Sequence, residues 1–274
     1  MIKNIAKLFI NPRRNVPLAF RLSYQYLSFC LQKKMCLLFQ NTTPFFQGQM
    51  DINPKSRWYN KKFIESTGGY YPKGSVINRQ ICNLESGDNT RRDMFVLLLR
   101  TIIDNKIEGD IAELGVYRGV TAKLFHYYAP ERTIHLFDTF EGFTKRGVVS
   151  EKENTNMQIS AALFSDTSVD AVKNHISQKN NNIQFYKGFF PDTITPSVKE
   201  KKFSFVHLDA DLYQPIIDGL AFFYQRMNPC GIMVIHDYNS WPGARKAVDE
   251  FFSDKNEMPL PMPDRSGSVV IVKQ

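Results

Sequence analysis

Charged side chains follow directly after two apolar runs of this sequence. The run FSFVHLDADLY ends in Asp209 and Asp211, and the run GIMVIHD ends in His236 and Asp237. In open parallel sheets, ligands bind beyond the carboxyl ends of the strands. These four side chains are therefore expected to point into one crevice, where they could hold a cation or accept a proton.

A turn that contains two glycines follows an earlier apolar run. The sequence ELGVYRGVTA places Glu113, Gly115 and Gly119 between a predicted strand and a predicted helix. Glycines there let the backbone approach a ligand and leave helix N-terminal amides to meet it. Roughly twenty residues later, as in dinucleotide-binding folds, the next run ends in Asp138, an acid suited to two ribose hydroxyls. Residues 113–119, which we call the glycine turn, therefore predict a nucleotide site together with Asp138.

Two cofactors could fill this nucleotide site. A nicotinamide dinucleotide prefers the spacing G-x-G-x-x-G, which brings backbone amides onto a pyrophosphate. This chain has E-x-G-x-x-x-G instead, and a carboxylate beside the turn repels a pyrophosphate but suits a ligand that carries an amine. S-adenosylmethionine has an ammonium group, a sulfonium and no phosphate, so the spacing favours it over NAD.

Strand and helix patterns alternate from residue 89 onward. A helix is predicted to begin at Asn89 and to end before Gly109, because TRRDMFVLLLRTII has apolar residues at helical spacing. Strands are predicted at 110–114, 133–138, 183–187, 203–209 and 231–237, with an edge strand at 268–273. This alternation predicts an α/β fold with a doubly wound, mostly parallel sheet.

Two features near the predicted site have open interpretations. The polar segment 144–160 is expected to be a loop beside the nucleotide site, either a lid or a plain surface excursion. Asp211 is either a catalytic residue or the cap of the helix that begins near Pro215. The sequence does not decide between these readings.

Most of the net positive charge of the chain lies in its N-terminal part. Seven of the 35 Lys and Arg lie in residues 1–50, which hold no acid, and this leaves 28 basic against 27 acidic residues beyond them. The near-neutral remainder argues against a nucleic-acid partner. Residues 1–85 are predicted to form a basic, aromatic, mainly helical extension and connection, through which the chain could form a homo-oligomer. Residues 86–274 are predicted to form the α/β domain.

The cysteine pattern and the lengths of the apolar runs indicate the cellular compartment of the protein. The four cysteines lack metal-type spacing and do not suggest a disulfide framework, which favours the reducing cytoplasm. No apolar stretch reaches the roughly 18 residues of a membrane helix, and no cleavage site of a signal peptide follows the N-terminus. We therefore expect a cytoplasmic protein without a membrane span.

Six motifs occur in the order of a known family: ELGVYRG, FDTFEGF, FSDTS, KGFFPDT, HLDADLYQ and HDYNSWPGARKAVDEF. With them the chain resembles the macrocin O-methyltransferase family, the sugar O-methyltransferases of macrolide and aminocoumarin antibiotic pathways. The similarity covers residues 86–255. It implies a class I (Rossmann-like) methyltransferase fold, S-adenosylmethionine as methyl donor, a magnesium-type ion and a hydroxyl of a sugar or glycoside as acceptor.

The resemblance also assigns residues to the parts of the donor. Those that would lie around the methionine part are Glu113, Gly115, Tyr117 and Gly119. Asp138 would hold the ribose, and Phe140 lies in the matching turn after it. Those that would fall near the adenine are Asp166, Gly188 and Phe189.

At the acceptor end, the resemblance implies a metal site with one departure. Asp209 corresponds to the family's first metal aspartate, but His236 and Asp237 stand where the family has an Asp-Asp pair. The three residues would hold Mg²⁺ or Mn²⁺. Magnesium prefers oxygen, so His236 is either a ligand of a softer ion such as manganese or a general base. Leu212 stands at the position of the lysine base of catechol-type relatives, which leaves proton removal to His236 or Asp211.

Two other functions compete with sugar methylation. One is a non-catalytic partner protein that keeps the fold, and the presence of both Glu113 and Asp138 argues against it. The other is a nicotinamide-dependent oxidoreductase, which the spacing of the glycine turn disfavours.

Overall fold

The computed structural model of the chain describes residues 88–176 and 182–274. The predicted N-terminal extension lies outside these residues. Within them, no helix combines the length and the apolar character that crossing a membrane requires.

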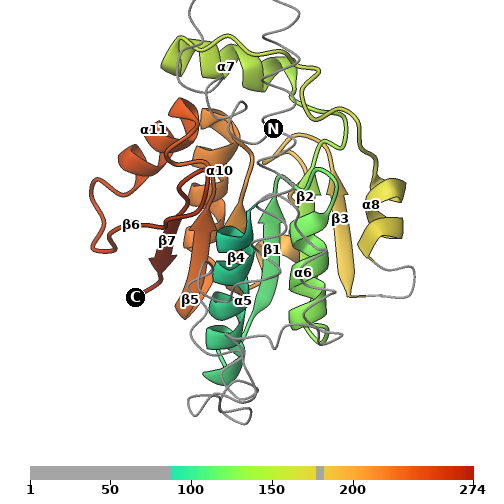
Figure 1. Cartoon of the computed structure of the whole chain (residues 1–274), viewed down its shortest axis with the longest axis vertical. Coiled ribbons are helices and arrows are strands. Elements are labelled where there is room, and N and C mark those ends of the chain that lie inside the picture. The colour runs from blue at the N-terminus through green and yellow to red at the C-terminus, as the bar shows by residue number, and fades with distance from the viewer. Residues whose placement is uncertain (1–87, 177–181) are drawn as a thin grey trace, which may run out of the picture. The chain divides into compact units, whose positions relative to one another are not determined.

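One mixed sheet organises the described part of the chain (Figure 1). Its seven strands have the order β3-β2-β1-β4-β5-β7-β6. The first five are parallel, namely β1 (Asp110–Leu114), β2 (Ile134–Asp138), β3 (Ile183–Lys187), β4 (Phe203–Leu208) and β5 (Met227–Ile235). The last two pair antiparallel, namely β6 (Leu260–Pro261) and β7 (Val269–Val272). The predicted doubly wound, mostly parallel sheet is therefore confirmed.

Helices cover both faces of this sheet (Figure 1). One face carries α5 (Asn89–Asp104), α6 (Val120–Tyr128) and α8 (Val169–Ile176). The other carries α9 (Pro196–Lys199), α10 (Tyr213–Tyr224) and α11 (Pro242–Phe251). The helix α7 (Lys145–Thr155) lies beyond the carboxyl ends of the parallel strands.

Two hydrophobic cores result from the alternation of side chains along each strand. On β5, Ile232 and Val234 pack under α5 and α6, whereas Met233 and Ile235 pack under α10 and α11. All four side chains are buried, and each such burial contributes about 1.5–3 kcal/mol. Because both faces are covered, the central strands are apolar throughout, and the polar residues at their carboxyl ends stand out in the sequence.

Three predictions about the elements near the site need correction. The segment 144–160 is not a loop throughout, because it contains α7. Asp211 does not cap α10, whose N-cap residue is Leu212 and has no side-chain cap. The strand predicted to begin at residue 231 begins at Met227, and the short β6 was not predicted.

The helix α7 was not predicted because the side chains that cap it and attach it to the rest of the fold are polar. Its first turn is capped by Thr144, whose hydroxyl accepts a hydrogen bond from the Gly147 amide at 3.0 Å. Glu151 is fully buried and accepts a hydrogen bond from the Tyr213 amide, at the amino end of α10, at 2.7 Å. A carboxylate is stabilised at the amino end of a helix. Glu151 therefore attaches α7 to α10, a role that a row of apolar side chains usually has.

Candidate functional site

A cavity of about 560 Å³ lies at the carboxyl ends of the parallel strands. The strand order reverses between β1 and β4, which is the switch point where open α/β sheets bind ligands. The sequence-predicted site residues that line this cavity are Glu113, Gly115, Tyr117, Asp138, Gly188, Phe189, Asp209, Asp211, His236 and Asp237. The structure therefore brings the predicted nucleotide site and the predicted acceptor site into one space.

Three residues predicted to contact the donor do not line this cavity. Gly119 turns the chain into α6 with φ 75°, and a Cβ there would lie 2.6 Å from Val172. Phe140 is 2% exposed and belongs to the hydrophobic core. Asp166 is exposed and accepts a hydrogen bond from the Tyr117 hydroxyl at 2.7 Å. These three residues thus have packing and tethering contacts in the structure, and their contacts with the donor stay predictions.

Asp138 is held by backbone amides at the end of β2. Its Oδ2 accepts hydrogen bonds from the amides of Val116 at 2.6 Å and Tyr117 at 2.9 Å. Its Oδ1 accepts from the amide of Phe140 at 2.6 Å. The carboxylate therefore fixes the glycine turn as well as facing the cavity, and any ribose hydroxyls must share its remaining lone pairs.

Gly115 brings the glycine turn against the end of β4. Its φ is +88°, and a Cβ on this residue would lie 2.1 Å from the carbonyl oxygen of Asp209. The Asp209 amide also donates to the carbonyl of Leu114 at 2.7 Å. The glycine therefore allows a close approach between two protein backbones, and this contact joins the two halves of the cavity.

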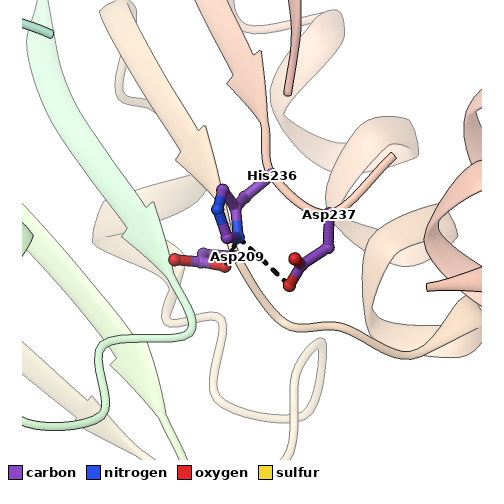
Figure 2. Close-up of side chains that lie close together, drawn as sticks. All are labelled: Asp209, His236 and Asp237. Carbon is purple, nitrogen blue, oxygen red and sulfur yellow. Dashed lines mark ion pairs between the residues drawn. The ribbon is translucent and has the colours of Figure 1, made fainter. Parts of the chain in front are cut away.

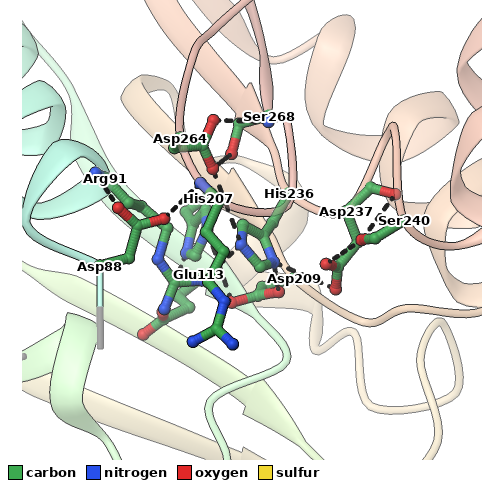
Figure 3. A network of polar contacts seen from close by, with 11 residues as sticks. Asp88, Arg91, Glu113, His207, Asp209, His236, Asp237, Ser240, Asp264 and Ser268 are labelled. Atoms are coloured by element: carbon green, nitrogen blue, oxygen red, sulfur yellow. Dashed lines mark hydrogen bonds and ion pairs between the residues drawn. The ribbon is translucent and has the colours of Figure 1, made fainter. Parts of the chain in front are cut away.

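Glu113 and His207 form a buried pair on the neighbouring strands β1 and β4 (Figure 3). His207 Nδ1 lies 3.0 Å from Glu113 Oε1, and both side chains are at most 1% exposed. Burial lowers the pKa of His207 to about 3, so the ring is neutral and donates from Nδ1 to the carboxylate. Its other nitrogen, Nε2, lies 3.8 Å from Asp209 Oδ2. This histidine therefore connects the glycine turn to the end of β4.

The acid–histidine cluster comprises Asp209, His236 and Asp237 (Figure 2). His236 Nδ1 lies 2.7 Å from Asp209 Oδ1 and 3.1 Å from Asp237 Oδ2. This nitrogen is buried, yet it makes no hydrogen bond of good geometry with either carboxylate. One ligand atom from each of the three residues lies within 4.8 Å of the others. The two strand ends thus meet as the sequence predicts.

Arg91 on α5 reaches the acid–histidine cluster from the side (Figure 3). Its Nη1 lies 2.7 Å from His236 Nε2 and 3.4 Å from Asp209 Oδ2. Burial lowers the pKa of His236, but the carboxylates of Asp209 and Asp237 outweigh it and raise the pKa to about 10. A guanidinium only donates hydrogen bonds, and two N–H groups cannot face each other at 2.7 Å. At this distance Nε2 must accept from Arg91, which leaves Nδ1 to carry the ring proton; the second proton that the raised pKa favours requires Arg91 to move away from Nε2.

Asp211 projects into the cavity beside the acid–histidine cluster. Its φ of 58° is unusual for a residue other than glycine. Burial and the nearby carboxylates of Asp209 and Asp237 raise its pKa well above the usual range. The Asp211 carboxyl is therefore the one that most readily holds a proton in this group of acids.

Comparison with known proteins assigns the chain to a family. The profile described as Macrocin-O-methyltransferase (TylF) matches residues 87–270. The chain belongs to the macrocin O-methyltransferase family. Two solved structures share the fold: the O-methyltransferase NovP has a TM-score of 0.59 at 20% identity, covering 81% of this chain and 92% of NovP. The calicheamicin methyltransferase CalS11 has a TM-score of 0.54 at 17% identity, covering 82% and 97%. The predicted class I methyltransferase fold is confirmed.

Two curated macrocin O-methyltransferase relatives are similar in sequence. The chain is 28% identical over 163 residues to demethyldecarbamoylnovobiocin O-methyltransferase of Streptomyces niveus, covering 55% of this chain and 60% of that protein. It is 27% identical over 174 residues to 8-demethyl-8-(2,3-dimethoxy-alpha-L-rhamnosyl)-tetracenomycin-C 4'-O-methyltransferase of Streptomyces olivaceus, covering 59% and 64%. The chain thus spans less than two thirds of the length of these relatives.

Two side chains of this macrocin O-methyltransferase family member were not predicted from the sequence. Arg91 lies in the first turn of α5, and no local pattern places it beside His236, which is 145 residues away. Asp264 lies in the polar turn before β7, where it accepts hydrogen bonds from the amide and the hydroxyl of Ser268 at 2.7 and 2.8 Å. Its Oδ2 is 3.9 Å from His236 Nε2. The polarity of PMPDRSGS is the only local signal for this buried acid.

The acid–histidine cluster fits a divalent cation in composition and spacing. Two carboxylates and an imidazole suit an ion such as manganese better than magnesium, which prefers oxygen, and the buried Nδ1 of His236, which makes no hydrogen bond, faces both carboxylates. To bind an ion, Nδ1 must give up its proton and Nε2 must carry one. Arg91 cannot then stay at 2.7 Å from Nε2. A cation and Arg91 therefore compete for His236.

Proposed function

We propose that this protein is an S-adenosylmethionine-dependent O-methyltransferase that methylates a hydroxyl of a sugar or glycoside. The observation that carries the proposal is the shared cavity, in which the glycine turn and Asp138 face the acid–histidine cluster. Membership of the macrocin O-methyltransferase family supports the donor and the reaction. The name of one curated relative, an O-methyltransferase of a rhamnosyl-tetracenomycin, supports the class of acceptor.

The donor is proposed to lie along the carboxyl ends of β1, β2 and β3. Its methionine part would lie at the glycine turn, where the buried carboxylate of Glu113 suits the ammonium group. Its ribose would lie at Asp138, and Gly188 and Phe189 line the adjoining wall for the adenine. The sulfonium would then face Asp209, because Gly115 packs directly against the Asp209 backbone.

The reaction is a displacement at the methyl carbon. The acceptor oxygen forms a bond to this carbon, the carbon–sulfur bond breaks with its electron pair going to sulfur, and the hydroxyl proton leaves to a base. The neighbouring His236 outweighs burial and holds the pKa of Asp209 below its usual range, which makes Asp209 a weak base, whereas burial and the nearby carboxylates raise the pKa of Asp211. We therefore propose His236 or Asp211 as the proton acceptor. A divalent cation, when bound by Asp209, His236 and Asp237, would lower the pKa of the acceptor hydroxyl.

Donor binding and methyl transfer can be tested separately. Isothermal titration of the purified protein with S-adenosylhomocysteine is expected to give a micromolar Kd and a raised Tm, because a ligand that binds only the native state stabilises it. Methyl transfer is then measured with labelled S-adenosylmethionine and a panel of glycosides, with and without chelator. The absence of any binding at millimolar S-adenosylhomocysteine would defeat the proposal, whereas binding of NADH in its place would support the oxidoreductase.

A further inference from the structure

One buried carboxylate of α7 contacts the first turns of both α10 and α11, on which α7 packs (Figure 1). Glu151 is fully buried, and its Oε2 accepts a hydrogen bond from the amide of Tyr213, the first residue of α10, at 2.7 Å. A Cβ on Gly243, in the first turn of α11, would lie 2.0 Å from the same oxygen, so the carboxylate lies directly against that backbone. The partial positive charge at the amino end of a helix stabilises a carboxylate. Glu151 therefore joins three helices at one point.

The helices α10 and α11 follow the two strand ends that carry the acid–histidine cluster. The loop that starts at Asp209, after β4, ends where α10 begins at Tyr213. The turn that contains Asp237, after β5, ends where α11 begins at Pro242. This turn is tight, because the Trp241 amide donates to the carbonyl of Asp237 at 2.8 Å. A movement of either helix end would therefore move the member of the cluster that precedes it.

The helix α7 also borders the cavity. Thr144, its N-cap residue, and Gly147, in its first turn, are among the residues that line the cavity. A Cβ on Gly147 would lie 3.1 Å from the side chain of Leu212, the N-cap residue of α10. The placement of α7 therefore affects both the cavity and the loop that starts at Asp209.

Other polar contacts of α7 with these two helices are less buried. Lys246 of α11 donates to Asn154 at 3.1 Å, but the Lys246 side chain is 36% exposed. Ser150 donates to Gln214 of α10 at 3.3 Å in a partly buried contact. Exposed charged side chains contribute little to stability, whereas a hydrogen bond from a backbone amide to a buried carboxylate is charge-assisted and strong. Glu151 is therefore the strongest of these polar contacts.

We propose that Glu151 is a positioning residue, which fixes the geometry of the acid–histidine cluster by holding the amino ends of α10 and α11 together. The inference rests on the proposed function and deepens it, because Asp209 and His236 can orient an acceptor hydroxyl only at a set separation. A misplacement of reacting groups by about 1 Å can cost roughly 100-fold in rate. Glu151 does not line the cavity, so it acts through the two helices.

Steady-state kinetics of methyl transfer test this role. For Glu151→Ala we expect kcat to fall by roughly 100-fold. The Kd for S-adenosylhomocysteine should change by less than about threefold, because the donor is proposed to lie along β1, β2 and β3. Glu151→Gln keeps one acceptor oxygen for the Tyr213 amide and should lose about tenfold in kcat.

Glu153→Ala is the matched control, because Glu153 is exposed on the same helix, and its kcat should equal that of the wild type. Wild-type kcat in Glu151→Ala would overturn the inference. A weakened donor Kd with an unchanged kcat would also overturn it, because α7 would then serve only to cover the donor.

Gly243→Ala disturbs the same contact from the other side. The three atoms nearest to the new Cβ would all belong to the Glu151 carboxyl group, at 2.0, 2.5 and 2.6 Å. The carboxylate must then move, so kcat should fall by roughly 100-fold, as in Glu151→Ala. In the Glu151→Ala background the added methyl group meets no carboxylate, and Gly243→Ala should change kcat by less than about twofold. Equal effects of Gly243→Ala in both backgrounds would overturn the inference.

The ring signals of His236 report the geometry of the cluster without turnover. The chain has five histidines, and comparison with His236→Gln identifies this ring in a nitrogen-edited NMR spectrum. Its Nδ1 lies 2.7 Å from Asp209 Oδ1, so a change in that separation shifts the nitrogen signal. We expect a shift in Glu151→Ala and none in Glu153→Ala, and an unshifted signal in Glu151→Ala would overturn the inference. Gly243→Ala takes the place of Glu151→Ala should the latter not fold.

The two measurements separate this inference from the proposed function. If Glu151→Ala shifts the His236 signal but the wild-type protein methylates none of the glycosides, the positioning role stands and the proposed reaction fails. If the wild-type protein methylates a glycoside and Glu151→Ala changes neither kcat nor the His236 signal, methyl transfer stands and the positioning role is refuted.

Discussion

The glycine turn and the acid–histidine cluster face each other across one cavity, but they are built differently. The glycine turn is held by backbone groups: three amides on Asp138 and the contact of Gly115 with the Asp209 carbonyl. The acid–histidine cluster is held by side chains from separate elements, with Arg91 of α5 and Asp264 of the turn before β7 around His236. Backbone contacts leave little freedom, whereas the side chains can exchange partners.

This difference matters for what each half can do. A site made of backbone amides is fixed before its ligand arrives, which suits a donor that is the same in every turnover. A site made of charged side chains can exchange Arg91 for a cation or an acceptor, since only side-chain rotations are required. We therefore expect substitutions in the glycine turn to affect folding and donor binding, and substitutions in the cluster to affect methyl transfer.

The largest effect is expected from Gly115→Ala. The new Cβ would lie 2.1 Å from the Asp209 carbonyl oxygen, and φ would stay at +88° only with strain. The free energy of unfolding should fall by about 3 kcal/mol, and S-adenosylhomocysteine binding should be lost. Urea unfolding and calorimetric titration measure the two effects. Gly147→Ala is the comparison variant: the nearest atoms to its Cβ would be the side-chain atoms Leu212 Cδ1 at 3.1 Å and Thr144 Oγ1 at 3.3 Å, so its free energy of unfolding should fall far less than that of Gly115→Ala.

Asp209→Asn tests the other half of the comparison. Methyl transfer should fall by roughly a thousandfold, because the side chain loses its charge beside the reacting hydroxyl. The Kd for S-adenosylhomocysteine should change by less than about threefold, since only the Asp209 backbone meets the glycine turn. A large loss of donor affinity would show that the two halves are not separable.

The variant His236→Asp decides whether His236 is a metal ligand or a general base. Retained or improved magnesium-supported turnover would identify the wild-type residue as a metal ligand, because magnesium prefers oxygen. Loss of turnover with Mn²⁺ still bound, measured by titration, would identify it as the base.

A smaller effect is expected from Asp138→Ala. Removing the carboxylate leaves the amides of Val116, Tyr117 and Phe140 without their acceptor, so the glycine turn loosens. The Kd for S-adenosylhomocysteine should rise by about 100-fold. Asp138→Asn keeps one acceptor oxygen and should give an intermediate Kd. Wild-type affinity in both variants would show that the ribose lies elsewhere.

Arg91→Met should strengthen metal binding. It removes the positive charge that lies 3.4 Å from Asp209 and frees Nε2 of His236 to carry the proton. The affinity for Mn²⁺, measured by calorimetric titration, should rise by about tenfold. Arg100→Met, on the same helix but paired with Asp104, is the control. Unchanged Mn²⁺ affinity would mean that Arg91 and the ion do not compete.

The smallest effect is expected from Asp166→Ala. Asp166 is exposed and does not line the cavity, and exposed ion pairs contribute little. The Kd for S-adenosylhomocysteine should change by less than about threefold, as measured by the same titration. A loss as large as that of Asp138→Ala would return Asp166 to the donor contacts that the family resemblance implies.

The sequence alone determined the strands of the sheet and what stands at their carboxyl ends. Apolar runs of strand length predicted β1 to β5 and β7 within a few residues, because buried parallel strands are apolar on both faces. The switch point of such a sheet then required Glu113, Asp138, Asp209 and His236 to meet. The strands and the residues at their carboxyl ends follow from the local apolar pattern and from the order of strands and helices, and both can be read from the sequence.

Only the tertiary structure decided which side chains complete the site. The helix α7 forms where the sequence shows no apolar stripe, because Glu151 docks it onto the amino end of α10. Arg91 reaches His236 because α5 packs across the sheet, and Phe140 turns into the core because its amide is bound by Asp138. Contacts between elements distant in the chain depend on packing distances of a few ångströms, and no spacing of residues along the sequence encodes these distances.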